Sequence, residues 1–213
     1  QHTFTGSNVY MLNVLRYYGE EIGVTTSSAL LSERVMETAT MVSTQTAAVH
    51  LENLALDGSS LSGDVVIESL VGHKFPGGYP SRRAWLHITV RDTAGNIVFE
   101  SGAVASDGRI SGNDNDEDAA RFEPHYTVLS APDQVQVYEA IILNSDREVT
   151  TVLLRAAAYA KDNRLLPQGF DLATAGSDIL VFGEAAQDSD FVGGSDRLGL
   201  QIDLGSAIGP FTV

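Results

Sequence analysis

The feature that most constrains the fold of this chain is a change of hydrophobic period after Thr44. Before it, residues 7–22 and 27–43 repeat apolar side chains at helical spacing and predict two helices. The expected N-caps are Ser7 or Asn8 for the first helix and Thr25 or Thr26 for the second. After it, apolar and polar side chains alternate in short segments, which is typical of strands with one buried face. The expected strands include "AAVHLENLAL", "DVVIESLVG", "AWLHITVRD", "QVQVYEAIIL" and "DILVFGEA", and "TAGN" is expected to form a hairpin from "AWLHITVRD" into "IVFES".

These short strands predict the fold class. Seven or more of them occur with turn signals between them and without a βαβ rhythm. We therefore expect a mainly β chain, built as an antiparallel β-sandwich (immunoglobulin-like) with a short N-terminal helical pair. The expected division is an N-terminal helical segment, 1–44, and a β-sandwich domain, 45–213.

Composition excludes several classes of protein. The 213 residues carry a net charge of −15, which disfavours nucleic acid as a partner because phosphates need Lys and Arg. The chain has no cysteine, so disulfides, Cys-ligated zinc, iron–sulfur clusters and covalent haem attachment through C-x-x-C-H are excluded within it. No apolar run approaches the ~18 residues of a membrane helix, and we expect no membrane insertion.

Catalytic signatures are missing from the sequence. It contains no G-x-S-x-G elbow, no Walker loop and no dinucleotide fingerprint. We therefore expect that the chain is not an enzyme, and a hydrolase acting on an extracellular polymer is the least favoured interpretation.

Two of the five histidines stand out by their surroundings. His50 and His87 fall inside strand patterns, where a histidine is usually a surface or hydrogen-bonded side chain. His73 in "GHKFP" and His125 in "EPHY" lie in loops beside proline. A backbone fixed by proline would aim the imidazole at a group outside the sheet.

An acidic stretch at 107–123 is a second candidate site. Hard oxygen donors at this density suit Ca²⁺, although the spacing differs from an EF-hand and a solvated acidic loop is an equal alternative. A second acidic segment, 188–196, has the same character. The calcium candidates are Asp107, Asn113, Asp114, Asn115, Asp116, Asp118 and Glu123.

Several long strings resemble one protein family. The strings "GHKFPGGYPSRRAWLHITVRD", "GNDNDEDAARFEPHY" and "YAKDNRLLPQGFD" are similar to the haem-free, β-rich C-terminal region of bacterial multihaem c-type cytochromes. The resemblance spans nearly the whole chain and is most specific over 72–170. It implies an accessory domain, periplasmic or extracellular at the cell surface, that packs against a haem-bearing segment or partner.

The resemblance also implies roles for individual residues. His73, His125 and His2 become candidates for distal axial haem ligands, and Arg82, Arg83 and Lys74 for contacts to haem propionates or to an interface. Since the chain lacks C-x-x-C-H, any haem c must be on a partner chain or a missing segment. The alternative is a calcium-stabilised extracellular binding or filament-assembly module, homo-oligomeric and without a redox role.

Overall fold

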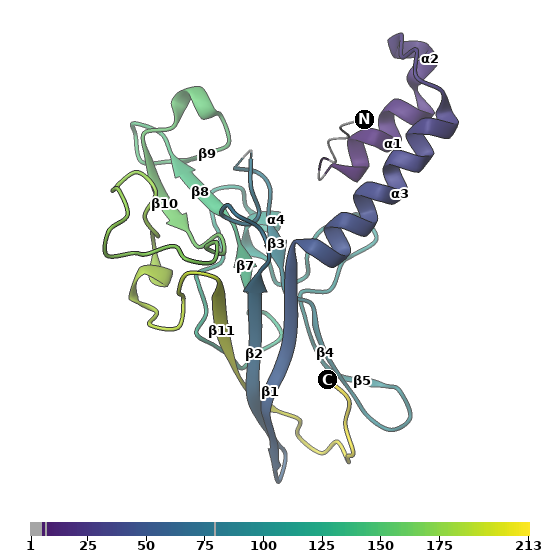
Figure 1. The fold of residues 1–213 in the computed structure, drawn as a ribbon. Coiled ribbons are helices and arrows are strands. Elements are labelled where there is room, and N and C mark those ends of the chain that lie inside the picture. Colours follow the sequence, from purple (N-terminus) through teal and green to yellow (C-terminus); the bar gives the residue numbers. More distant parts are fainter. Residues whose placement is uncertain (1–5, 7, 79) are drawn as a thin grey trace. The chain divides into compact units, whose positions relative to one another are not determined.

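The computed structural model describes residue 6 and residues 8–78 and 80–213, and it divides the chain into two compact units, 1–48 and 49–213. The sequence predicted a boundary at 44/45. Strands make up 31% of the chain and helices 20%, which confirms a mainly β protein (Figure 1). We describe each unit by itself.

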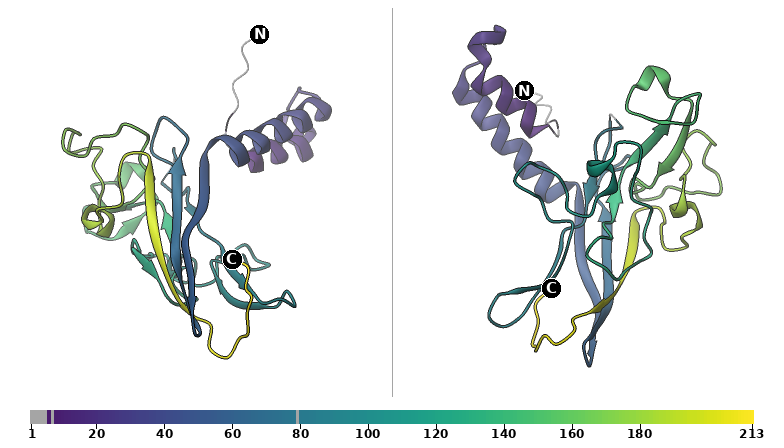
Figure 2. Two further views of the ribbon diagram at one scale, coloured as in Figure 1. Left: turned by 60° about the horizontal axis from the view of Figure 1, so that its bottom comes forward. Right: turned by 180° about the vertical axis from the view of Figure 1, so that it is seen from behind.

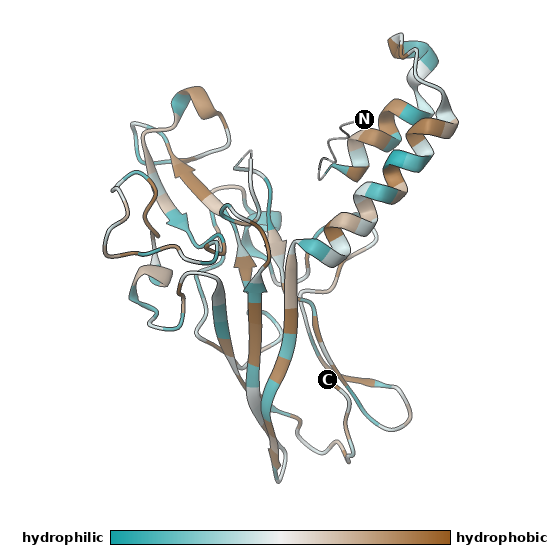
Figure 3. Ribbon diagram, viewed as in Figure 1, coloured by the Kyte–Doolittle hydropathy of each residue, from teal (hydrophilic) through white to brown (hydrophobic). Residues whose placement is uncertain are grey.

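The first unit contains the helices α1 (Val9–Tyr17), α2 (Gly19–Ile22) and α3 (Ser28–Gln45). The Asn8 side chain caps α1 by accepting the Met11 amide at 2.9 Å, as expected. The predicted helix over 27–43 matches α3, but the predicted N-cap was wrong, because Ser27 and not Thr25 or Thr26 caps the helix, through the Leu30 amide at 3.3 Å. Hydrophilic and hydrophobic residues alternate along α3 (Figure 3). None of the described helices is long and apolar enough to cross a membrane.

The main sheet of the second unit has four strands in the order β1-β2-β11-β6. Their bounds are β1 (Ala47–Asp57), β2 (Ser60–Ser69), β11 (Ser195–Asp203) and β6 (Val128–Leu129). Strands β2 and β11 pair antiparallel along the whole of β11, from Ser195 opposite Glu68 to Asp203 opposite Ser60. Strand β6 runs parallel to β11, so the sheet is not purely antiparallel as the sequence predicted. The first three strands lie side by side in every view (Figures 1 and 2).

Three smaller sheets complete this unit. Their orders are β10-β8-β9, β3-β7 and β4-β5. The bounds are β3 (Ala84–Trp85), β4 (Ile88–Arg91), β5 (Ile97–Ser101), β7 (Val137–Tyr138), β8 (Ala140–Leu143), β9 (Val149–Thr150) and β10 (Ala158–Asp162). The predicted strand in "DILVFGEA" is wrong, because this segment holds one bridge at Phe182 and the 3₁₀ helix Glu184–Gln187.

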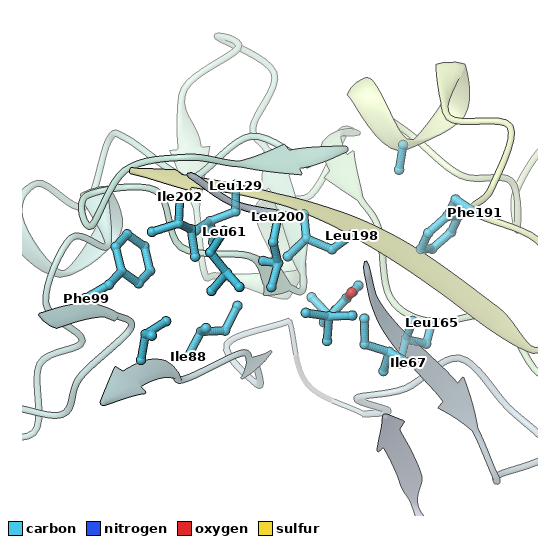
Figure 4. Close-up of a cluster of buried hydrophobic side chains, with 14 of the residues drawn as sticks. Leu61, Ile67, Ile88, Phe99, Leu129, Leu165, Phe191, Leu198, Leu200 and Ile202 are labelled. Carbon is cyan, nitrogen blue, oxygen red and sulfur yellow. The ribbon is translucent and has the colours of Figure 1, made fainter. Parts of the chain in front are cut away.

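Alternation along β2 and β11 builds the core. On one face of the sheet, alternate residues of both strands are buried, apart from the half-buried Gly63, while the opposite face is polar except for the buried Val66. Side chains from β4, β5, β6 and β7 belong to the same cluster, so one core joins three of the sheets (Figure 4). Its members include Leu61, Val65, Ile67, Ile88, Phe99, Leu129, Leu198, Leu200 and Ile202.

Truncation of Leu198 tests this core. Leu198 is fully buried, so we expect Leu198→Ala to lower the free energy of unfolding by about 2–5 kcal/mol through lost burial and a residual cavity. The matched control is Leu154→Ala, which removes a leucine that is 99% exposed and should change stability by less than about 0.5 kcal/mol. Urea unfolding of both variants measures the difference, and equal stabilities would contradict the assignment of the core.

Candidate functional site

The loop that follows β2 is held firmly against the body of the β unit. Lys74 Nζ donates to Asp162 Oδ2 at 2.7 Å and to the Leu180 carbonyl at 2.9 Å. The backbones of Phe75 and Leu165 exchange two hydrogen bonds, of 2.9 and 2.8 Å. Burial lowers the pKa of the Lys74 ammonium, and the Asp162 carboxylate partly offsets this effect. Lys74 therefore anchors the loop, and its charge is already paired.

His73 lies on the exposed side of this anchored loop. Its Nδ1 is 2.9 Å from the Lys74 carbonyl oxygen. Because a carbonyl oxygen only accepts, Nδ1 must carry the proton, and in the neutral ring the lone pair is on Nε2. The ring lies against Gly77, where a Cβ would come within 3.0 Å of it. The loop thus fixes one tautomer of an exposed imidazole.

The two arginines of this loop differ in what they bind. Arg83 Nη2 donates to both oxygens of Asp116, at 2.7 and 2.8 Å. Burial would raise the pKa of Asp116, but the Ile110 amide and Arg83 outweigh it and lower that pKa. Arg82 donates to the Gly77 carbonyl at 3.2 Å and has no carboxylate partner among the described residues. Of the three cations predicted to meet a propionate or an interface, Arg82 is the one that the chain leaves exposed beside His73.

His125 has the opposite environment. Its side chain is fully buried, and Nε2 lies 3.0 Å from Asp188 Oδ2 and 3.9 Å from Asp196 Oδ1. Its Nδ1 lies 2.9 Å from Gln136 Nε2 and 3.1 Å from Asn163 Nδ2. Phe191 packs edge-on against the ring, with the ring centroids 5.2 Å apart. No face of this imidazole is open to a partner.

The neighbouring amides decide the tautomer of His125. Gln136 Oε1 accepts the Tyr126 amide at 2.9 Å, so the NH₂ group of Gln136 must face His125. Asn163 is oriented in the same way, because its Oδ1 accepts the Glu139 amide at 2.9 Å. Two donors therefore converge on Nδ1, which must accept, and Nε2–H donates to Asp188.

This tautomer removes His125 from the candidate ligands. A histidine that binds a metal or a haem iron through Nε2 keeps its proton on Nδ1 and donates it to an acceptor. Here two N–H groups occupy that side, and the ring is buried. The expectation that His125 points outside the sheet is wrong, since the loop turns it inward onto the second acidic segment.

His125, Asp188 and Asp196 form the one group of three or more metal-ligand side chains that the described residues bring together, within 4.8 Å. The Nε2–H of His125 already donates to Asp188, and the Tyr138 hydroxyl donates to Asp196 at 2.6 Å. Burial raises the pKa of Asp196 and that of Tyr138. The arrangement is a buried hydrogen-bond network that joins distant segments, rather than an open set of ligands.

The acidic loop, 107–123, contains the short helix α4 (Asp114–Glu117), and most of its candidate ligands have partners within the chain. Asp114 pairs with Arg121 at 2.6 Å, and Glu123 accepts the Asp114 amide and the Tyr126 hydroxyl at 2.9 and 2.7 Å. Four other candidates also have partners: Asp107 faces Arg109, Asp116 faces Arg83, Asp118 accepts the Ala120 amide, and Asn115 donates to the Arg121 carbonyl. Asn113 differs, because its side chain is buried and its amide N and O have no hydrogen-bond partner among the described residues. In the part of the chain that the structure describes, this loop gathers no metal-ligand group.

The remaining histidines provide a comparison. His50 Nε2 lies 3.1 Å from Glu52, and His87 Nε2 lies 2.9 Å from Glu100. Both rings are exposed, but a carboxylate lies at Nε2, the nitrogen for which His73 has no partner among the described residues. His2 lies outside the described residues.

The buried carboxyl of Asp196 gives the chain a defined pH response. Burial raises the pKa of Asp196 in the folded chain above the ordinary value of 3.8. As pH rises above 3.8, the folded chain therefore keeps the Asp196 proton to a higher pH than the unfolded chain does. The free energy of unfolding therefore falls with rising pH in that window, by about 1.4 kcal/mol for each unit by which the pKa is raised. Asp196→Asn removes this slope. Urea unfolding against pH measures it, and equal slopes in both proteins would contradict the assignment.

No family model, curated protein or solved structure matches this chain. Its function is therefore inferred from its own residues and their geometry.

Proposed function

We propose that this chain is an accessory module of a multihaem electron-transfer system, in which His73 supplies an axial imidazole to a haem carried by another chain or segment. The observation that supports this most is the tautomer of His73. Its Nδ1–H donates to the Lys74 carbonyl, the residue is exposed, and Nε2 has no hydrogen-bond partner among the described residues. This is the form that an axial histidine needs.

The anchoring of the loop supports the same role. An axial ligand must be held in place, because a mobile side chain would lose conformational entropy on binding. Lys74, bonded to Asp162 and Leu180, fixes the residue next to His73 to the body of the unit. A haem whose iron has two imidazole ligands transfers electrons rather than binding a substrate at iron.

The β unit would act as the rigid support for this ligand. We propose that its sheets form two layers of a β-sandwich, with the β1-β2-β11-β6 sheet facing the smaller sheets across the core. Core members from β2 and β11 pack with Ile88 of β4 and Phe99 of β5, as two facing layers would require.

This role needs no catalytic residue, and we propose a non-enzymatic module at the periplasm or cell surface. The calcium-stabilised module has less support. Three of the five candidate carboxylates, those of Asp116, Asp107 and Asp114, pair with Arg83, Arg109 and Arg121.

A haem peptide with one axial histidine and an open sixth position tests the proposal. We expect the chain to convert the ferric peptide from high-spin to low-spin, with a red-shifted Soret band, because His73 is exposed and its Nε2 has no partner among the described residues. His73→Ala should weaken this binding at least about tenfold.

The matched controls are His50→Ala and His87→Ala, which remove exposed imidazoles whose Nε2 faces a carboxylate. Both should leave the titration unchanged. Equal binding by the wild type and the His73→Ala variant would refute the role of His73.

A further inference from the structure

Strand β1 is an open edge of the main sheet. It has eleven residues and pairs with β2 on one side, while no described strand pairs with its other side (Figures 1 and 2). Backbone N–H and C=O groups along such an edge are a template for a further strand. This edge does not involve His73, so an assembly through it is independent of the proposed haem role.

One face of β1 is polar and points away from the core. Glu52 accepts from Arg197 at 2.8 Å, and Asn53 donates to Asp64 at 2.7 Å. His50 lies 3.1 Å from Glu52 on the same side. Asp64 and Arg197 alternate with the buried core residues of β2 and β11, so they lie on the outer face of the sheet. The three β1 side chains, His50, Glu52 and Asn53, therefore lie on the outer face as well.

The core-side face of β1 is apolar and uncovered. Gly63 is in phase with the core residues of β2, and a Cβ on it would lie 2.6 Å from Leu54 Cδ2. Leu54 therefore points to the core side. Alternation then places three further aliphatic residues on that side. The four side chains and their exposed fractions are Val49 at 56%, Leu51 at 37%, Leu54 at 46% and Leu56 at 48%.

An extra residue makes this pattern symmetrical. Asn53 has a left-handed φ of +54°, and it follows Glu52 on the same face, as the extra residue of a β-bulge does. As a consequence, two residues that lie equally far from the Glu52–Asn53 peptide bond, one on each side of it, are on the same face of the strand. A regular strand lacks this symmetry, because residues related about a peptide bond fall on opposite faces.

We propose that the chain forms a two-fold dimer in which β1 pairs antiparallel with β1 of a second copy about the Glu52–Asn53 bond. This register sets Val49 opposite the partner's Leu56 and Leu51 opposite the partner's Leu54, with all four on one face of a continuous sheet.

The charges of β1 are compatible with this register. Glu52 meets the partner's Asn53, His50 meets the partner's Ala55, and Asp57 meets the partner's Ala48, so no like charges are directly opposed. Each copy has a net charge of −15, which opposes association at long range. Salt screens that repulsion, so dimerisation should strengthen as ionic strength rises.

Sedimentation equilibrium of the full chain, from micromolar to submillimolar concentration at low and high salt, tests the dimer. We expect Leu51→Lys and Leu54→Glu each to weaken dimerisation at least about tenfold, because each buries a charge against a leucine. The control, Leu154→Lys, places the same charge on a side chain that is 99% exposed elsewhere and should leave the dimer intact. Circular dichroism checks that each variant is folded.

Mixing the two variants tests the register itself. In the mixture, the lysine introduced in one chain faces the glutamate introduced in the other, while the second pair keeps its two leucines, so heterodimers should recover the lost affinity. A wild-type chain that stays monomeric at all concentrations and salts would overturn the proposal. So would variants that dimerise like the wild type, or a mixture that shows no recovery.

Discussion

The long antiparallel pairing of β2 with β11 is the interaction on which the rest of the β unit depends. It brings residues 60–68 beside 195–203 and aligns their buried side chains on one face, which is where the core forms. Asp196, at the start of β11, lies beside His125, and β6, the strand that follows His125, pairs with β11. The chain leaves β2 directly into the His73 loop. The edge strand β1 borders the other side of β2.

His73 and His125 differ in tautomer because different hydrogen-bonding groups lie beside their Nδ1 atoms. At His73 the neighbouring group is a carbonyl, which requires a proton on Nδ1. At His125 two amide NH₂ groups require a lone pair on the same atom. The two loop histidines are thereby held in opposite tautomers, with the proton on Nδ1 of His73 and on Nε2 of His125. Swapping either neighbour would change the role that its histidine can play.

Local patterns predicted the helices, β1, β2 and the β4–β5 hairpin, because each depends on neighbouring residues. The buried network was not predictable, because it joins segments that are far apart in sequence, such as Asn163, Gln136 and Asp188. A weak signal was present: Gln136 is polar between Val135 and Val137, all three of which are buried. The acidic segment at 188–196 was noted, but only the fold shows that it meets His125.

The orientation of His125 was wrongly predicted for the same reason. Proline beside a loop histidine indicates a fixed backbone but not its direction, and the direction is set by distant partners. The pairing of Arg83 with Asp116 also joins residues far apart in sequence. It gives Arg83 a carboxylate partner that the neighbouring Arg82 lacks among the described residues. In contrast, the exposure of His73 follows from a local turn in which the next residue's carbonyl binds the ring.

The most direct test of the account is the tautomer of His73, measured from long-range ¹H–¹⁵N correlations of the histidine rings at a pH where they are neutral. The account predicts protonated Nδ1 and unprotonated Nε2 for His73, and the reverse for His125. His73 and His125 can be assigned with His73→Gln and His125→Gln. An Nε2–H tautomer at His73 would contradict the account, because the nitrogen offered to a haem iron would then carry a proton.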